Sequence, residues 1–259
     1  MVYYYLTAFL LAIHSLVGWA KVPTPAMQEA VAPYLLPPDH PAKEVLDAIF
    51  SKRVSLDTMT LEKAGFVGVR LLHGGQTIAR HPALPGFFFK FVVDRNSQTW
   101  IYGTNQYRKQ DEYLEFTARI QNRNELERLI EKHQIRTIIL PKKWIYPIPP
   151  LGEQPAGTIK KFYLLLAEDM HILSFEENTK RWRTDITKEH LDELYLLITE
   201  AKLSDVNTFN IAFCEGSDTL AFVDTKPHPP ENMNFEEITP YLNPEMVEYW
   251  HALMNSLRQ

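Results

Sequence analysis

The chain has 259 residues, of which 45% are hydrophobic and 23% are charged, and its formal net charge is −5. This is the composition of an ordinary globular protein. The negative balance, together with the absence of any run rich in Lys or Arg, argues against a nucleic-acid partner. The single cysteine, Cys214, excludes an intramolecular disulfide. Stability must therefore come from a packed core.

Residues 1–20 form an apolar stretch without a charged side chain, and Gly18 and Ala20 end it at small-residue spacing before Lys21. This pattern resembles a secretory signal peptide cleaved after Ala20, which predicts an exported protein, either periplasmic or secreted. The alternatives are an uncleaved membrane anchor, because the stretch approaches the ~20 residues that a span requires, and a buried core helix. Residues 21–40 are rich in proline and predict an extended linker.

Residues 41–94 predict two helices and then three strands. The first helix begins at Pro41, and the second spans 57–64, where Gly65 ends it. The apolar face of the first helix consists of Val45, Leu46, Ile49 and Phe50. The strands cover 66–72, 77–80 and 86–94, with a turn at His73-Gly74-Gly75 between the first two.

The third of these strands is apolar except for Lys90 in its middle. A lysine in a hydrophobic strand is costly to bury unless its ammonium meets an anion. We therefore treat Lys90 as a candidate binding residue. The alternative is that its aliphatic stem lies along the sheet and its ammonium reaches solvent at an edge.

Residues 110–167 predict a charged helix and further strands. The helix covers 110–133; Asn122 or Asn124 is a candidate cap for its second half, whose apolar stripe is Leu126, Leu129 and Ile130. The strands cover 137–140, 144–148 and 161–167, with a loop rich in Pro and Gly before the last. This order of elements predicts a mostly antiparallel sheet with a helix packed on it, and hence an α+β fold.

The remainder is mainly helical apart from one hairpin. Thr187 is the predicted cap of a helix that turns Leu191, Leu194, Tyr195, Ile198 and Ala201 inward. Asn243-Pro244 begins the last helix, whose stripe is Met246, Trp250, Leu253, Met254 and Leu257. The hairpin, at 203–226, is predicted to consist of a loop, a strand, a tight turn and a second strand. Cys214, beside its first strand, is expected to be buried and unreactive.

Three polar residues lie in this hairpin at the spacing of a known family. Asp205 and Asn210 are five positions apart between a helix and a strand, like the Asp and Asn of the kinase catalytic loop H-R-D-L-x-x-x-N. Asp224 ends the following strand, where kinases carry the Asp of D-F-G. Lys90 lies in mid-strand, like the phosphate-pairing lysine. The chain therefore resembles the protein-kinase-like superfamily, and its catalytic-loop pattern is similar to that of small-molecule phosphotransferases.

The resemblance implies a two-lobed fold, with an antiparallel, sheet-rich N-lobe at 41–167 and a small, mostly helical C-lobe at 168–259. It also implies ATP and Mg²⁺ as cofactors. Asn210 and Asp224 would then ligate Mg²⁺, and Asp205 would orient the acceptor hydroxyl or accept its proton. Each has a plainer interpretation, because Asp205 or Asn207 can cap a turn and Asp224 can face water at a strand end.

Nucleotide binding follows from the same resemblance. Lys90 would hold the α- and β-phosphates. Glu125 is the chosen partner of Lys90 because it flanks the apolar stripe of the helix, with Glu127 and Glu131 as alternatives. The strand that enters Glu168 and Met170 resembles the hinge that frames adenine.

Two functions are consistent with these residues. The first is an exported, secreted bacterial kinase-like protein, acting on a host as an atypical ATP/Mg-dependent phosphotransferase with a hydroxyl acceptor. The alternative is a catalytically inactive pseudokinase or scaffold that binds a protein partner such as a host factor. It is suggested by Thr225-Lys226 in place of Phe-Gly and by the lack of G-x-G-x-x-G before Lys90. A hydrolase or zinc enzyme is disfavoured, because H-E-x-x-H, G-x-S-x-G and a Cys/His cluster are all missing.

Overall fold

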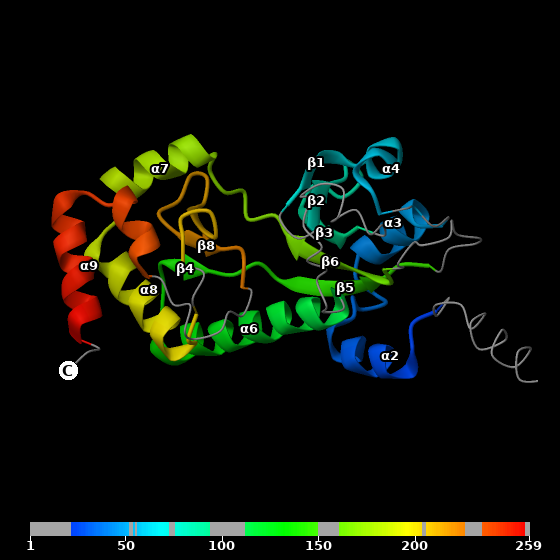
Figure 1. Ribbon diagram of the computed structural model, residues 1–259, viewed down its shortest axis with the longest axis horizontal. Helices are drawn as coiled ribbons and strands as arrows, with labels where there is room; N and C mark the ends of the chain where they lie inside the picture. The colour runs from blue at the N-terminus through cyan, green and yellow to red at the C-terminus, as the bar shows by residue number, and fades with distance from the viewer. Residues whose placement is uncertain are drawn as a thin grey trace, which may run out of the picture. The chain divides into compact units, whose positions relative to one another are not determined.

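The computed structural model describes residues 22–51, 54, 56–72, 76–93, 112–149, 161–203, 206–225 and 235–256. Its elements are mixed helices and strands, which confirms the α+β class (Figure 1). The chain divides into two compact units. The first comprises Met1–Pro85, Phe89–Tyr113 and Ile145–Leu165, and the second comprises Gly86–Phe88, Leu114–Trp144 and Leu166–Gln259. The predicted signal peptide lies outside the described residues, and no helix within them is both long and apolar enough to cross a bilayer.

The first unit begins with a helix where the sequence predicted an extended linker. Helix α2 covers Pro25–Val31 and is followed by a 3₁₀ turn, η1, at Ala32–Tyr34. The side chain of Thr24 accepts the N–H of Met27, so α2 has a proper N-cap. Proline at the first helical position loses no hydrogen bond, because that N–H has no partner in a helix. The extended conformation predicted for residues 21–40 is therefore wrong at α2.

Two short helices of the first unit follow the predicted positions. Helix α3 spans Ala42–Ile49 directly after Pro41. Helix α4 spans Thr58–Lys63, and the Asp57 carboxylate caps it by accepting the N–H of Thr60 at 2.9 Å. Gly65 ends α4 with φ +92°, a conformation that favours glycine.

The larger sheet, most of whose residues belong to the first unit, has the strand order β1-β2-β3-β6-β5. Its strands are β1 Val67–Leu71, β2 Gln76–Arg80, β3 Phe87–Val92, β5 Lys143–Pro147 and β6 Tyr163–Glu168. The pairs β1/β2 and β2/β3 are antiparallel, as predicted. Phe66 packs edge-on against Phe89 and Phe91, whose rings are fully buried. This aromatic cluster forms part of the core of the first unit.

Helix α6 is one continuous helix, Glu112–His133. Asn122 and Asn124 lie inside it, so the prediction that either of them caps a second helix is wrong. The apolar positions are as expected, because Leu126 and Leu129 are buried. Ion pairs at i,i+4 spacing support the continuous helix: Glu115–Arg119 precedes the asparagines and Arg123–Glu127 spans Asn124.

The second unit has its own small sheet, in the order β4-β8-β7. The strands are β4 Ile138–Ile139, β7 Ile211–Phe213 and β8 Leu220–Phe222. Strands β7 and β8 form the predicted antiparallel hairpin. Strand β4 pairs in parallel with β8, with Ile138 opposite Leu220. The hairpin is thereby extended by a strand from much earlier in the chain.

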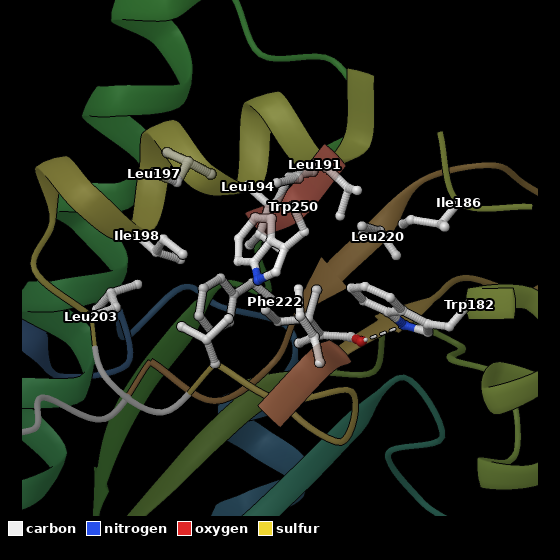
Figure 2. Packing of buried hydrophobic residues seen from close by; sticks show 14 of the residues in the cluster. Trp182, Ile186, Leu191, Leu194, Leu197, Ile198, Leu203, Leu220, Phe222 and Trp250 are labelled. Atoms are coloured by element: carbon white, nitrogen blue, oxygen red, sulfur yellow. Dashed lines mark hydrogen bonds between the residues drawn. The ribbon is translucent and has the colours of Figure 1, made fainter. Parts of the chain in front are cut away.

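Helices pack around this sheet to form the core of the second unit. They are α7 Phe175–Thr184, α8 Lys188–Glu200, the 3₁₀ segment η4 Phe235–Tyr241 and α9 Pro244–Ser256. Thr187 caps α8, and the Asn243 side chain accepts the N–H of Met246 at the start of α9; both caps were predicted. Figure 2 shows Leu191, Leu194, Leu197 and Ile198 of α8 near Trp182, Trp250, Leu220 and Phe222.

Candidate functional site

The β7–β8 hairpin places both predicted metal ligands at one end of a strand pair. Asn210 immediately precedes β7, and Asp224 follows β8 by two residues. The Val223 N–H donates to the Asn210 carbonyl at 2.8 Å, which extends the antiparallel ladder beyond the strands. Both side chains are partly exposed. Asn210 and Asp224 thus lie at the same end of the hairpin, where Asn210 is opposite the residue before Asp224.

Asp224 is engaged by a buried arginine of α6. The guanidinium of Arg119 donates to Asp224 Oδ1 through Nη1, and through Nη2 it donates to Glu115 Oε1 at 2.9 Å. Arg119 and Glu115 are both buried, whereas the Asp224 side chain is 23% exposed. One cation is therefore held between two carboxylates, one of which is the residue that the sequence assigned to Mg²⁺.

Thr225 ties the same point of the chain to α6. Its hydroxyl donates to the main-chain carbonyl of Arg119 at 2.7 Å and accepts from Lys143 Nζ at 2.9 Å. Thr225 and Lys143 are buried. The Thr225 hydroxyl therefore joins Lys143 to the main chain of α6. The formal charges of Glu115, Arg119, Lys143 and Asp224 sum to zero.

Sequence reasoning missed Arg119 and Lys143. A local signal for Arg119 was present, because Glu115, Arg119, Arg123 and Glu127 recur at four-residue spacing and so share one face of a helix. Arg123 also uses its Nε to donate to the Pro141 carbonyl at 3.2 Å. The long-range partner, Asp224, could not be found in that pattern, because a residue more than 100 positions away must be brought to it by the fold.

Lys90 belongs to the first unit and lies on β3 opposite Ile78 of β2. It is half-buried between Phe89 and Phe91, which are fully buried; side chains alternate along a strand, so Lys90 points to the other face of the sheet. Glu125, its proposed partner, belongs to the second unit and accepts two hydrogen bonds from Arg128, at 2.7 and 2.9 Å. That contact lowers the pKa of Glu125. Of the alternatives, Glu127 binds Arg123, and Glu131 is exposed.

Glu168 and Met170 follow the buried part of β6. The Glu168 N–H donates to the Lys142 carbonyl at 3.0 Å, and its carboxylate accepts the Lys142 N–H at 2.9 Å. The next residue, Asp169, donates its N–H to the Gly86 carbonyl. Met170 is half-buried. The Glu168 side chain therefore holds the chain at Lys142.

Asp205, the predicted catalytic residue, lies outside the described residues. The turn that follows it is described. Asn207 Oδ1 accepts the N–H groups of Phe209 and Asn210, both at 3.0 Å. Asn207 is thus the turn-capping residue that its type favours.

The described residues contain no group of three or more His, Cys, Asp or Glu side chains that could hold a metal ion. No protein-family model matches the chain, and a comparison with curated proteins found no match either. The geometry around the hairpin is therefore what bears on function.

Proposed function

We propose that the chain is a catalytically inactive, kinase-like protein that serves as a scaffold and binds a protein partner. The observation that supports this proposal best is the ion pair between Arg119 and Asp224. An arginine remains protonated under all physiological conditions. Its charge neutralises the carboxylate that a kinase would offer to Mg²⁺ and repels a divalent cation at the same oxygen. The environment of Asp224 does not fit a resident Mg²⁺.

The neighbouring contacts support the same conclusion. Arg119 is itself fixed by Glu115 and by the Thr225 hydroxyl on its main-chain carbonyl. Releasing Asp224 for a metal would leave a buried guanidinium with one carboxylate fewer, which is unfavourable. The ion pair therefore acts as a structural link between α6 and the end of β8.

A second candidate function is the atypical phosphotransferase. It is favoured by one observation, the position of Asn210 and Asp224 at the same end of the β7–β8 hairpin. An amide and a carboxylate are oxygen ligands of the kind that Mg²⁺ takes in phosphate sites. The two candidates differ in whether Arg119 yields Asp224 to a metal.

Thermal unfolding with and without Mg²⁺ and ATP distinguishes the two functions. A ligand that binds only the folded state raises the melting temperature with its concentration. We expect no rise with MgATP, ATP alone or Mg²⁺ alone up to millimolar concentration. The matched variant is Asp224→Asn, which keeps an oxygen for Arg119 but loses the charge that a metal needs. A rise with MgATP in the natural chain that disappears in this variant would show that Asp224 takes part in MgATP binding, which would contradict the proposed structural role of Asp224 and favour the second candidate.

A further inference from the structure

Two phenylalanines of the second unit stack on each other at the surface. Phe175 is the first residue of α7, and Phe209 lies in the turn before β7. Their ring centroids are 4.7 Å apart and the planes differ by 1°. Phe175 is nevertheless 49% exposed and Phe209 is 61% exposed. We call these two residues the aromatic pair. A parallel stack leaves the outer face of each ring available, and exposed apolar surface of this kind often marks an interaction site.

Hydrogen bonds fix the main chain that carries each ring of the aromatic pair. Ser174 and Glu177 form a reciprocal capping box that fixes the first turn of α7, which begins with Phe175. Asn207 Oδ1 accepts the Phe209 N–H and so fixes the turn that carries the second ring. Neither ring is placed by its own burial. Because the order is supplied by neighbouring hydrogen bonds, a partner that binds the rings loses little free energy in ordering them.

A buried amide connects the two elements that carry the rings. Asn178, on α7, is 2% exposed. Its Nδ2 donates to the Thr208 carbonyl at 2.8 Å, and its Oδ1 accepts the Phe213 N–H at 2.9 Å. The side chain therefore joins α7 to the residue before Phe209 and to β7. The stacked geometry is a property of the folded unit and does not depend on the rings alone.

The charged residues that follow Phe175 in the first turn of α7 are acidic. Glu176 and Glu177 occupy the first turn of α7, next to Phe175, and both are exposed. The chain as a whole carries a net charge of −5. A cation is attracted to the face of an aromatic ring, and a guanidinium can also lie flat against it. The Glu177 carboxylate accepts the Ser174 hydroxyl in the capping box, so Glu176 is the acidic group offered to a cation. An arginine suits both features, with its plane on a phenylalanine ring and its charge attracted by Glu176.

We propose that the aromatic pair, with Glu176, is the docking site for an arginine side chain in an exposed segment of a partner protein. This inference rests on the proposed scaffold function and adds to it the surface used and the chemistry of the partner. It does not depend on whether Asp224 binds a metal. The Mg²⁺ and ATP experiment tests the proposed function, whereas the aromatic pair is tested separately by peptide binding.

The test uses fluorescence anisotropy with three labelled nine-residue peptides in which glycine alternates with Arg, Lys or Glu. We expect the Arg peptide to bind more tightly than the Lys peptide, and the Glu peptide not to bind. Phe209→Ala and Phe175→Ala should each weaken binding of the Arg peptide about 5- to 10-fold, because hot-spot aromatic contacts and cation–π contacts are lost. Glu176→Gln should weaken it about threefold, with a smaller effect at high salt.

The control is Met59→Ala, which removes another exposed apolar side chain, 62% exposed, from the first unit. It should leave the affinity unchanged. Binding that is equal for the Arg and Lys peptides and unaffected by the phenylalanine variants would show attraction by net charge only and would overturn the proposal. Sedimentation of the chain alone supplies a second outcome: a dimer that dissociates in Phe209→Ala would assign the aromatic pair to a second copy of the chain and would also overturn it.

Discussion

Asn178 is a single residue on which two elements depend. Its amide satisfies the Thr208 carbonyl and the Phe213 N–H inside the second unit, and it is buried itself. A buried polar group that loses its partner costs more than the net value of the bond, because the group left behind cannot reach water. Without the Asn178 amide, the Thr208 carbonyl and the Phe213 N–H would each be buried without this hydrogen-bond partner.

Asn178→Ala should therefore lower the free energy of unfolding by about 2–4 kcal/mol, since two buried main-chain groups lose their partner. Urea unfolding followed by far-ultraviolet circular dichroism measures this change. The control is Thr184→Ala on the exposed end of the same helix, for which we expect a loss of less than about 1 kcal/mol. A loss for Asn178→Ala as small as for the control would mean that these hydrogen bonds contribute little.

Cys214 is buried at the end of β7, as the sequence predicted. Burial raises the pKa of its thiol, although a hydrogen bond with Thr219 partly opposes the shift. A raised pKa leaves less thiolate at any pH below it, and the thiolate is the reactive form. With a disulfide reagent at pH 8, we expect the native chain to react at least tenfold more slowly than the unfolded chain. Because the pKa of the buried thiol is raised, the reaction rate of the native chain should still increase with pH after the rate of the unfolded chain has become constant. Equal rates in both states would contradict this expectation.

At the scale of elements, helix boundaries followed from local chemistry. Asp57, Thr187 and Asn243 are short polar side chains just before an apolar stripe, and each caps the helix that follows. The linker prediction failed at α2 because proline was interpreted as extended, although it also suits the first turn of a helix. Arg119 could be placed on a helix face from sequence, but its contact with Asp224 depends on the tertiary fold.

The contact between α6 and the end of β8 gives a prediction about stability. Asp224→Ala should lower the free energy of unfolding by about 3 kcal/mol, because it removes one of two carboxylates from a buried guanidinium. Asp224→Asn, which keeps a hydrogen-bond acceptor, should cost less than half as much. Denaturant unfolding of both variants, in the absence of any nucleotide, provides the measurement. If Asp224→Ala left the free energy of unfolding unchanged, the ion pair would not support the fold.

At the scale of the whole molecule, each unit has a core of its own. The core of the second unit is built around Trp182 and Trp250, which are fully buried and whose indole N–H groups donate to the carbonyls of Ile211 and Phe235. Tryptophans of this kind combine a large apolar surface with one satisfied donor. The core of the first unit contains phenylalanines instead, such as Phe66, Phe89 and Phe91.

Trp250→Ala should therefore destabilise the second unit by about 3–5 kcal/mol, the usual cost of a large cavity in a core. The effect is measured by native-state hydrogen exchange, in which amides of α8 and α9 should lose protection. Amides of β1 to β3 serve as the internal control and should retain their protection. A uniform loss over both groups of amides would show that the two units unfold as one cooperative structure.

The parallel pair of β4 and β8 has a consequence for the order of folding. Ile138 and Leu220 are joined across this pair, although α7, α8 and β7 lie between them in the chain. During synthesis β4 is complete long before its partner exists, whereas β7 and β8 can pair as soon as their hairpin leaves the ribosome. Contacts between residues so distant in sequence form slowly, because closing a long loop costs entropy before the contact stabilises it. The hairpin should thus form first, and β4 should dock onto it late.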